Sequence, residues 1–473
     1  MTDSSSTSLS RASLTALVIG SMVGAGIFTL PAKFATASGG LAALAAWGIA
    51  GGGMLMLAFV FQTLSQRRPD LDAGIYAYAK AGFGDYLGFA AALGYWITCC
   101  LAQLACLILI KATLGAFVPI FGDGSTPAAV LSASLLLWGV HALVLRGITQ
   151  AAALNTIATV AKIVPLLAFL VAAALAFRAE VFAANFAPRA APSLFEQVRG
   201  TMLLTVFVFV GIEGASVYSR LARQRSDVGF ATVAGFLVVL ALLVAVTMLS
   251  YGILPQAELA QLPTPSVAGV MAAIVGPWGL AFVSLSLIVS VLGNYLSWAL
   301  LAAEVLFSAA RHRTMPSFLA RENRNQVPVS ALWLSNLVIQ AFLIVTSFAD
   351  ETFALAMRMT SAMTLLPYLL VAGYGLQLAW SGETYAADPR GRRGDLLRSA
   401  VAVVYAAAML IAGGLTFLLL SAAVYAPGTA LYVLAQRERG APLFSARERL
   451  LFALVVVAAL AAVHGLWSGA IAV

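Results

Sequence analysis

Two glycine-rich stretches decide how this chain folds: residues 20–26 read GSMVGAG, and residues 211–216 read GIEGAS. Each stretch interrupts the middle of a long apolar segment. Glycine in a helix interior costs about 1 kcal/mol relative to alanine, so its repeated use there indicates a break in the helix. Unwound backbone is stable at membrane depth only where it faces protein or a cavity. Paired interruptions in two halves of a chain therefore predict a solute site of the kind that membrane transporters use.

The composition places the chain in a lipid bilayer. Of its 473 residues, 62% are hydrophobic and 10% are charged, whereas soluble domains have about 45–50% and about 25%. The net charge of +8 is carried by short clusters between apolar blocks, which argues against nucleic acid as a partner. Three cysteines in one apolar block exclude a disulfide framework, and three scattered histidines predict no metal site and no cofactor.

Two other classes of membrane protein do not fit the sequence. An integral membrane enzyme is not expected, because no cluster of His, Asp, Cys or Ser side chains falls at membrane depth. A channel is not expected either, because no repeated filter motif or hydrophilic ring is visible. The interpretation that remains is a transporter.

Thirteen apolar segments are long enough to cross a bilayer, since about 20 helical residues span its apolar core. We expect them near residues 12–33, 41–65, 84–118, 128–146, 153–177, 199–221, 229–254, 277–308, 330–349, 353–380, 398–413, 414–436 and 447–471. The pair that flanks Gly413-Gly414 can also be read as one long kinked helix. Residues 1–473 are thus predicted to form a single all-α polytopic domain.

The distribution of basic residues predicts the orientation. Most Lys and Arg residues fall in alternate loops, and the positive-inside rule assigns those loops to the cytoplasm. This places the amino terminus in the cytoplasm and the carboxyl terminus outside, in a plasma (inner) membrane. Residues 35–37 read ATA and resemble a signal-peptide cleavage site, but the first apolar segment is longer than a usual signal and is interrupted by glycines. We therefore interpret it as a membrane span.

The two breaks suggest a ligand. Freed amides and a half-helix amino end attract a carboxylate, while freed carbonyls and a half-helix carboxyl end attract an ammonium group. Together they suit a zwitterionic amino acid. The alternative is that the glycines only let helices pack closely, since small residues four apart are common between membrane helices.

Ionisable residues inside the predicted spans are candidates for function. Lys162 is expected near mid-membrane, as a proton-titrating group, as a fixed cation in place of a sodium ion, or as a structural donor to a broken helix. Glu213 lies in the second break, as a gate or proton sensor or as a cap on freed amides. Glu304 either pairs with Arg311 or takes part in gating, and Arg358 either reaches the outer interface or points into the cavity.

The order of motifs along these spans resembles the amino acid–polyamine–organocation superfamily. The similarity is greatest to its basic amino acid/polyamine antiporter branch and, within that branch, to the arginine/ornithine antiporter type. It covers nearly the whole chain and is carried by residues 20–31, 69–84, 209–216, 225–229, 298–316 and 366–368.

The resemblance implies a five-plus-five inverted-repeat fold with alternating access. The first repeat would span about 12–177, the second about 199–380, and additional helices would lie at about 398–471. Members of the superfamily are often homodimers. The implied function is exchange of amino acids, arginine for ornithine or a related pair, and the alternative is proton-coupled uptake with Lys162 as the titrating group.

The resemblance also implies roles for individual residues. Gly24, Ala25 and Gly26 would bind the substrate carboxylate through their backbone, and Val210 and Gly211 would lie beside its amino group. The remaining matches concern the substrate side chain and the gate. The side-chain subsite would be lined by Phe207, Trp298, Gln103 and the Thr98-Cys99 pair. Glu213 matches a gating glutamate, and Lys162 resembles the fifth-span lysine of several proton-coupled or sodium-independent relatives. Phe207 stands where exchangers of arginine for agmatine have tryptophan.

Overall fold

A computed structural model describes residues 10–71, 74–147, 151–186, 192–213, 225–349, 351–386 and 388–471. Parts of two quoted motifs lie outside these ranges: Asp72 and Ala73 of the motif at 69–84, and Gly214, Ala215 and Ser216 of the motif at 209–216. Within the described residues the secondary structure is helical, with one isolated bridge between Glu322 and Pro328. The all-α prediction is therefore confirmed.

The first half of the chain begins with a helix that is interrupted. Its elements are α1 (Arg11–Met22), η1 (Ala25–Thr29), α2 (Leu30–Ala37), α3 (Gly40–Arg67), α4 (Ile75–Phe83), α5 (Asp85–Gly115), α6 (Pro127–Leu145), α7 (Ala151–Leu175) and α8 (Ala179–Phe186). The predicted first span is the pair formed by α1 with η1 and α2, which bends by 44°. The predicted fifth span is α7, after which the chain turns by 97° into α8.

The second half begins with α9 (Leu194–Phe209), whose amino end is closed by a capping box between Ser193 and Glu196. It continues with α11 (Arg225–Ser250), α12 (Gln256–Gln261), α13 (Ser266–Val275), α14 (Pro277–Arg311), η4 (Ser317–Ala320), α15 (Val329–Thr346) and α16 (Thr352–Ser381). The chain closes with α17 (Arg392–Ala412), α18 (Gly414–Arg439) and α19 (Ala446–Trp467).

Helices α17 and α18 are two separate spans that run in opposite directions. Gly414 has a φ of +82°, which permits the sharp turn between them. At the start of α17, Asp395 pairs with Arg67, and near the end of α18, Arg439 pairs with Asp85. Since Arg67 and Asp85 lie at the same end of the molecule, the chain crosses and returns, and the alternative of one kinked helix is wrong.

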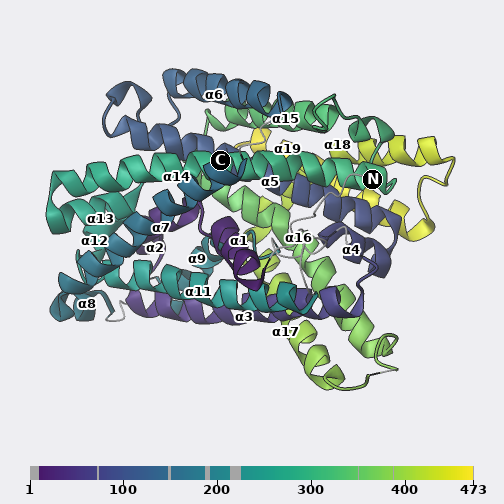
Figure 1. Ribbon diagram of the computed structural model, residues 1–473, viewed down its shortest axis with the longest axis horizontal. Coiled ribbons are helices and arrows are strands. Elements are labelled where there is room, and N and C mark those ends of the chain that lie inside the picture. The colour runs from purple at the N-terminus through teal and green to yellow at the C-terminus, as the bar shows by residue number, and fades with distance from the viewer. Residues whose placement is uncertain are drawn as a thin grey trace, which may run out of the picture.

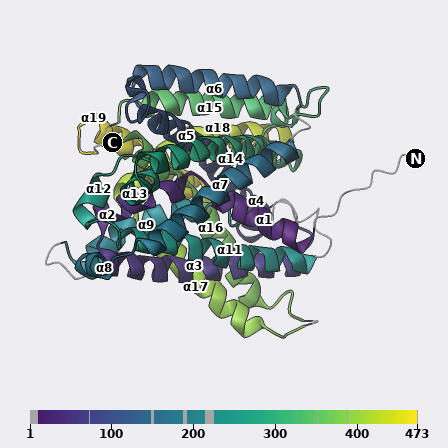
Figure 2. The ribbon, with the colours of Figure 1, turned by 60° about the vertical axis from the view of Figure 1, so that its left-hand side comes forward.

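The helices form layers around a central group. Figures 1 and 2 show α1, α9 and α16 in the middle, with α3 and α11 on one side and α14, α15 and α6 on the other. The short helices α8, α12 and α13 gather at one end, opposite α4. In the described part of the chain, ten helices are long and apolar enough to cross a membrane, or up to twelve if each bent pair is one span. The predicted count of thirteen is not confirmed by these residues.

Candidate functional site

The first break lies between Met22 and Ala25. Helix α1 continues through Gly20 and ends at Met22, after which Gly24 adopts an extended conformation with φ −118° and ψ −150°. A five-residue 3₁₀ helix then starts at Ala25. All five of its residues are buried, and no side chain in the described ranges caps its amino end. The first amides of a helix have no partner within it, so this end presents N–H groups and a positive dipole inside the protein.

The second break follows Phe209. Helix α9 ends there, Val210 is extended, and Gly211 has a φ of +108°, a conformation that favours glycine. The amide of Gly211 donates to the Glu213 carboxylate at 3.2 Å and 3.3 Å. Because of this turn, α9 stops inside the bundle, and the negative pole of its helix dipole lies there.

The two breaks touch each other. The Ser21 hydroxyl donates to the Gly211 carbonyl at 2.9 Å. A Cβ at Gly211 would lie 2.9 Å from the backbone of Ser21, and a Cβ at Gly26 would lie 2.6 Å from the Val208 side chain. Both glycines are therefore required for the close approach of α1 and α9. Residues that are 190 positions apart in sequence form one continuous patch of unwound backbone.

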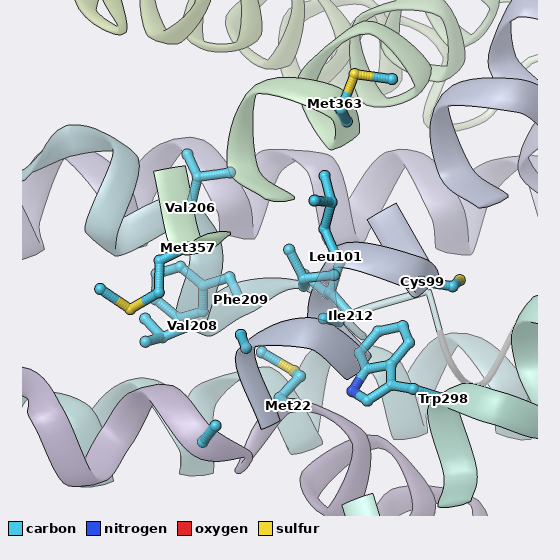
Figure 3. Close-up of a cluster of buried hydrophobic side chains, with 14 of the residues drawn as sticks. Met22, Cys99, Leu101, Val206, Val208, Phe209, Ile212, Trp298, Met357 and Met363 are labelled. Carbon is cyan, nitrogen blue, oxygen red and sulfur yellow. The ribbon is translucent and has the colours of Figure 1, made fainter. Parts of the chain in front are cut away.

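A narrow cavity lies beside this patch. Figure 3 shows a cluster of buried apolar side chains that includes three of its lining residues, Met22, Val208 and Trp298, together with Ile212 of the second break. The residues that line the cavity are Ser21, Met22, Gly24, Ala25, Gly26, Ala102, Cys106, Phe207, Val208, Val210, Asn294, Trp298 and Thr360. None of these lining residues has a charged side chain. A charged ligand in the cavity would therefore meet backbone dipoles, hydroxyl and amide groups, and the aromatic faces of Phe207 and Trp298.

Comparisons with known proteins show the family of the chain. The family model of the amino acid permeases matches residues 9–435. The chain belongs to the amino acid permease family. It is 50% identical over 99% of both chains to a Pseudomonas aeruginosa protein named arginine/ornithine antiporter. It is 43% identical to a Corynebacterium glutamicum L-lysine transport protein, covering 98% of this chain and 96% of that one. It is 35% identical to a Chlamydia pneumoniae arginine/agmatine antiporter over 94% of each.

Six of the predicted substrate residues of this permease line the cavity: Gly24, Ala25, Gly26, Phe207, Val210 and Trp298. Gly211 does not line it and instead joins the two breaks. Gln103 is not among the lining residues either. Its amide nitrogen donates to the carbonyls of Cys99 at 3.2 Å and Trp298 at 3.4 Å, and its buried amide oxygen has no hydrogen-bond partner among the described residues.

The geometry of α5 explains the position of Gln103. Ala102 and Cys106 are four residues apart and so share the helix face that meets the cavity. Gln103 is turned about 100° from Ala102. The Thr98-Cys99 pair is also buried outside the lining, and the Thr98 hydroxyl accepts a hydrogen bond from Thr364 at 2.9 Å. Helix α5 thus presents small side chains to the cavity.

Glu213 connects three helices next to the cavity. Its two carboxylate oxygens accept hydrogen bonds from Tyr95 of α5 and Tyr368 of α16, each at 2.6 Å. Tyr95 precedes Ala102 by seven residues, and Tyr368 follows Thr360 by eight residues on a helix of opposite direction. At about 1.5 Å per residue, the two tyrosines therefore start about 10–12 Å along their helices from the lining residues, toward the end of the molecule that carries α4. The carboxylate that they bind also accepts from the Gly211 amide, next to the lining residue Val210.

Lys162 of α7 contacts the last turn of α1, just before the first break. Its side chain is 4% exposed, and its Nζ donates to the Gly20 carbonyl at 2.6 Å. Gly20 is among the last residues of α1, whose carbonyls lose their helical partners when the helix ends at Met22. The ammonium group therefore stabilises the carboxyl end of α1 through both a hydrogen bond and the helix dipole. This geometry fits the structural alternative and is compatible with the other two.

Sequence analysis missed several residues of the site. Asn294 and Thr360 line the cavity, and the Asn294 amide lies so close to Gly24 that a Cβ there would be 2.8 Å from its nitrogen. A polar residue in the middle of an apolar span was the available signal for both. For Arg358 the sequence allows either the outer interface or the cavity. In the structure Arg358 is exposed and lines a separate crevice between α9, α16 and the α17–α18 turn. It is not among the residues that line the central cavity.

Proposed function

We propose that this permease exchanges amino acids across the plasma (inner) membrane, arginine for ornithine or a related basic pair. The observation that carries the proposal is the meeting of two unwound segments at a cavity lined without charged side chains. The amides that begin with Ala25 would bind the carboxylate, and the carboxyl end of α9 at Val210 would receive the ammonium group. The names of the relatives, which mention arginine, ornithine, lysine and agmatine, support a basic substrate.

The aromatic faces suit the far end of such a substrate. Phe207 and Trp298 line the cavity from α9 and α14. A guanidinium or ammonium group over an aromatic face gains about 0.5–2 kcal/mol or more as it is desolvated. A basic side chain would therefore be retained here without a carboxylate counter-ion. Uncharged walls also allow two different cations to use the same site in turn, which is what exchange requires.

Alternating access would involve the Glu213 cluster. In this structure Tyr95, Tyr368 and Glu213 join α5, α16 and the break after α9 on the α4 side of the cavity. Hydrogen bonds to a charged acceptor contribute about 1.5–3 kcal/mol each. Breaking them would separate the three helices and open a path toward α4, and ligand bound at the second break lies next to this switch.

Counterflow tests the proposal. Proteoliposomes are loaded with ornithine or left empty, and uptake of labelled arginine is measured after dilution. Rapid uptake is expected only into the loaded vesicles, and internal agmatine and lysine show which partners are accepted. Equal uptake into empty vesicles would contradict exchange. Vesicles without protein serve as the inactive control.

Proton-coupled uptake is a second candidate, favoured by the buried Lys162 ammonium group on the first break. If Lys162 releases a proton in each cycle, a proton gradient should drive arginine accumulation into empty vesicles. Lys162→Ala should then abolish that accumulation and its pH dependence while sparing exchange. Accumulation that is unchanged in the variant, or absent from the wild type, would exclude this function.

The orientation, the repeats and the oligomeric state are also proposals. Arg67, Arg68, Lys80 and Arg439 cluster at the end that carries α4, which supports a cytoplasmic position for that end and for the start of α1. Helix α19 would then end outside. The two inverted repeats, at about 12–177 and 199–380, and the dimer are implied by the resemblance. Light scattering in detergent would measure the dimer.

A further inference from the structure

The crevice that contains Arg358 is distinct from the central cavity. It lies where α9, α16 and the α17–α18 turn meet, and its charged lining residues are Glu196, Arg199 and Arg358. Arg358 and Thr360 are two positions apart on α16, so they face nearly opposite directions. Thr360 lines the central cavity while Arg358 lines the crevice. The crevice therefore has its own chemistry.

Two guanidinium groups reach this crevice with few partners. Arg199 Nε makes one long bond of 3.4 Å to the Ala412 carbonyl. Among the residues that the structure describes, neither Arg199 nor Arg358 has an ion pair within 4.0 Å. The carboxylate of Glu196 is engaged by Ser193, whose amide and hydroxyl donate to it at 2.9 Å and 2.8 Å. The crevice thus has a net positive charge and several unused donors.

The other walls of the crevice are apolar. Leu203 and Phe417 line it, and Ile411 and Leu415 beside it are 74% and 69% exposed on the outer surface of the same turn. An exposed apolar surface of this kind on a membrane protein faces lipid chains. The guanidinium groups therefore lie at the depth where an apolar surface meets the polar end of the bundle, which is the level of lipid headgroups.

We propose that Arg199 and Arg358 form a binding site for a phosphate group, either that of an acidic phospholipid or free inorganic phosphate. Guanidinium groups bind phosphate oxygens in a bidentate manner, which favours arginine in such sites. The acyl chains of a lipid would lie along Phe417 and Leu415. Because the crevice contacts α9 and α16, which also line the central cavity, its occupant would contact two helices of the transport machinery.

The site can be tested on the full-length protein in neutral detergent, independently of any transport activity. Apparent Kd values are measured for phosphatidylglycerol, phosphatidylcholine and inorganic phosphate, by native mass spectrometry for the lipids and by thermal shift for phosphate. Wild-type protein should bind phosphatidylglycerol more tightly than phosphatidylcholine. The double variant Arg199→Gln/Arg358→Gln should weaken phosphatidylglycerol binding by about tenfold or more, since each lost bond is one to a charged group.

Two further variants make the test specific. Arg321→Gln/Arg324→Gln removes the same charge from exposed arginines at the other end of the molecule and should leave the Kd unchanged. Glu196→Gln keeps the capping box, which accepts Gln as well as Glu, but removes the competing carboxylate, so it should tighten phosphatidylglycerol binding. A merely structural role for Glu196 predicts no such gain.

The outcomes separate the two sources of phosphate. Arginine-dependent binding of phosphatidylglycerol supports the lipid. Arginine-dependent stabilisation by inorganic phosphate, with no preference between the two lipids, supports the free anion and excludes the lipid. The proposal is overturned if neither ligand binds, or if Arg199→Gln/Arg358→Gln binds phosphatidylglycerol as the wild type does.

Discussion

Replacing Gly211 by alanine should separate the two broken helices. Gly211 has a φ of +108°, and a Cβ there would lie 2.9 Å from the Ser21 carbon and oxygen. Strained backbone of this kind costs about 1–3 kcal/mol, and an added methyl in a packed site costs about another 1–3 kcal/mol. Even the lower sum of about 2 kcal/mol reduces the equilibrium constant between the assembled and the separated breaks about 30-fold.

Substrate binding and exchange measure this effect directly. We expect the apparent Kd of arginine for Gly211→Ala to rise by up to about 30-fold at this energy, and counterflow to fall accordingly. Gly20→Ala is the matched control, because no atom lies within 4 Å of a Cβ at Gly20 and α1 is helical there. Alanine should be tolerated or slightly stabilising at that position, with a Kd within about twofold of the wild type.

A second variant keeps the test decisive if Gly211→Ala does not fold. Ser21→Ala removes only the hydroxyl that bonds the Gly211 carbonyl and introduces no clash. Losing a neutral hydrogen bond of about 0.5–1.5 kcal/mol should raise the Kd by about two- to tenfold. The reasoning is refuted if Gly211→Ala binds and exchanges arginine like the wild type, or if Gly20→Ala is equally damaging.

Three further changes have expected outcomes. Glu213→Gln replaces a carboxylate that accepts hydrogen bonds from Tyr95 and Tyr368 with an amide that can accept on one side only. The counterflow rate should fall about tenfold or more, and a wild-type rate would contradict the gating role. Phe207→Leu should weaken arginine binding by about 0.5–2 kcal/mol while affecting a neutral amino acid less, and isothermal titration with arginine and leucine would show the difference. The pKa of Asp70 is lowered, chiefly by its hydrogen bond from Arg68, so the stability that this carboxylate contributes is present above the usual pKa near 4 and is lost as pH falls through the folded value. Because the pair is exposed, this contribution is at most about 1 kcal/mol of the free energy of unfolding. Asp70→Asn should therefore show a smaller decline in unfolding temperature than the wild type between about pH 5 and pH 3, and an identical decline in both proteins would exclude the contribution.

The fold was largely predictable, because apolar length and glycine interruption are local signals. Residues 20–26 predict a break, and the structure places it at Met22–Ala25. The sequence includes Gly20 in the predicted break, but α1 remains helical at this residue. The short helices α8 and α12 were missed because they are amphipathic or polar caps, held by contacts such as the Asn185 amide on the Tyr251 carbonyl at 2.7 Å. Such contacts join segments far apart in sequence.

From the residues alone, the candidate site was predictable only where unwound backbone forms it, whereas Phe207 and Trp298 were expected at the cavity from the resemblance. Gly24, Ala25, Gly26 and Val210 lie at the cavity because the breaks lie there. The convergence of Tyr95 and Tyr368 on Glu213 depends on the registry of three helices, which no periodicity within one helix reveals. Placing Ala102 and Cys106 rather than Gln103 at the cavity is likewise a question of helix rotation, and one residue step changes the answer by about 100°.

A structure of the permease with arginine bound, determined by electron cryomicroscopy in lipid nanodiscs, tests the central claim most directly. The account predicts the carboxylate of arginine against the amides that begin with Ala25, its ammonium group beside Val210, and its guanidinium group between Phe207 and Trp298. Arginine bound away from both breaks, or a continuous helix through either break, would contradict it.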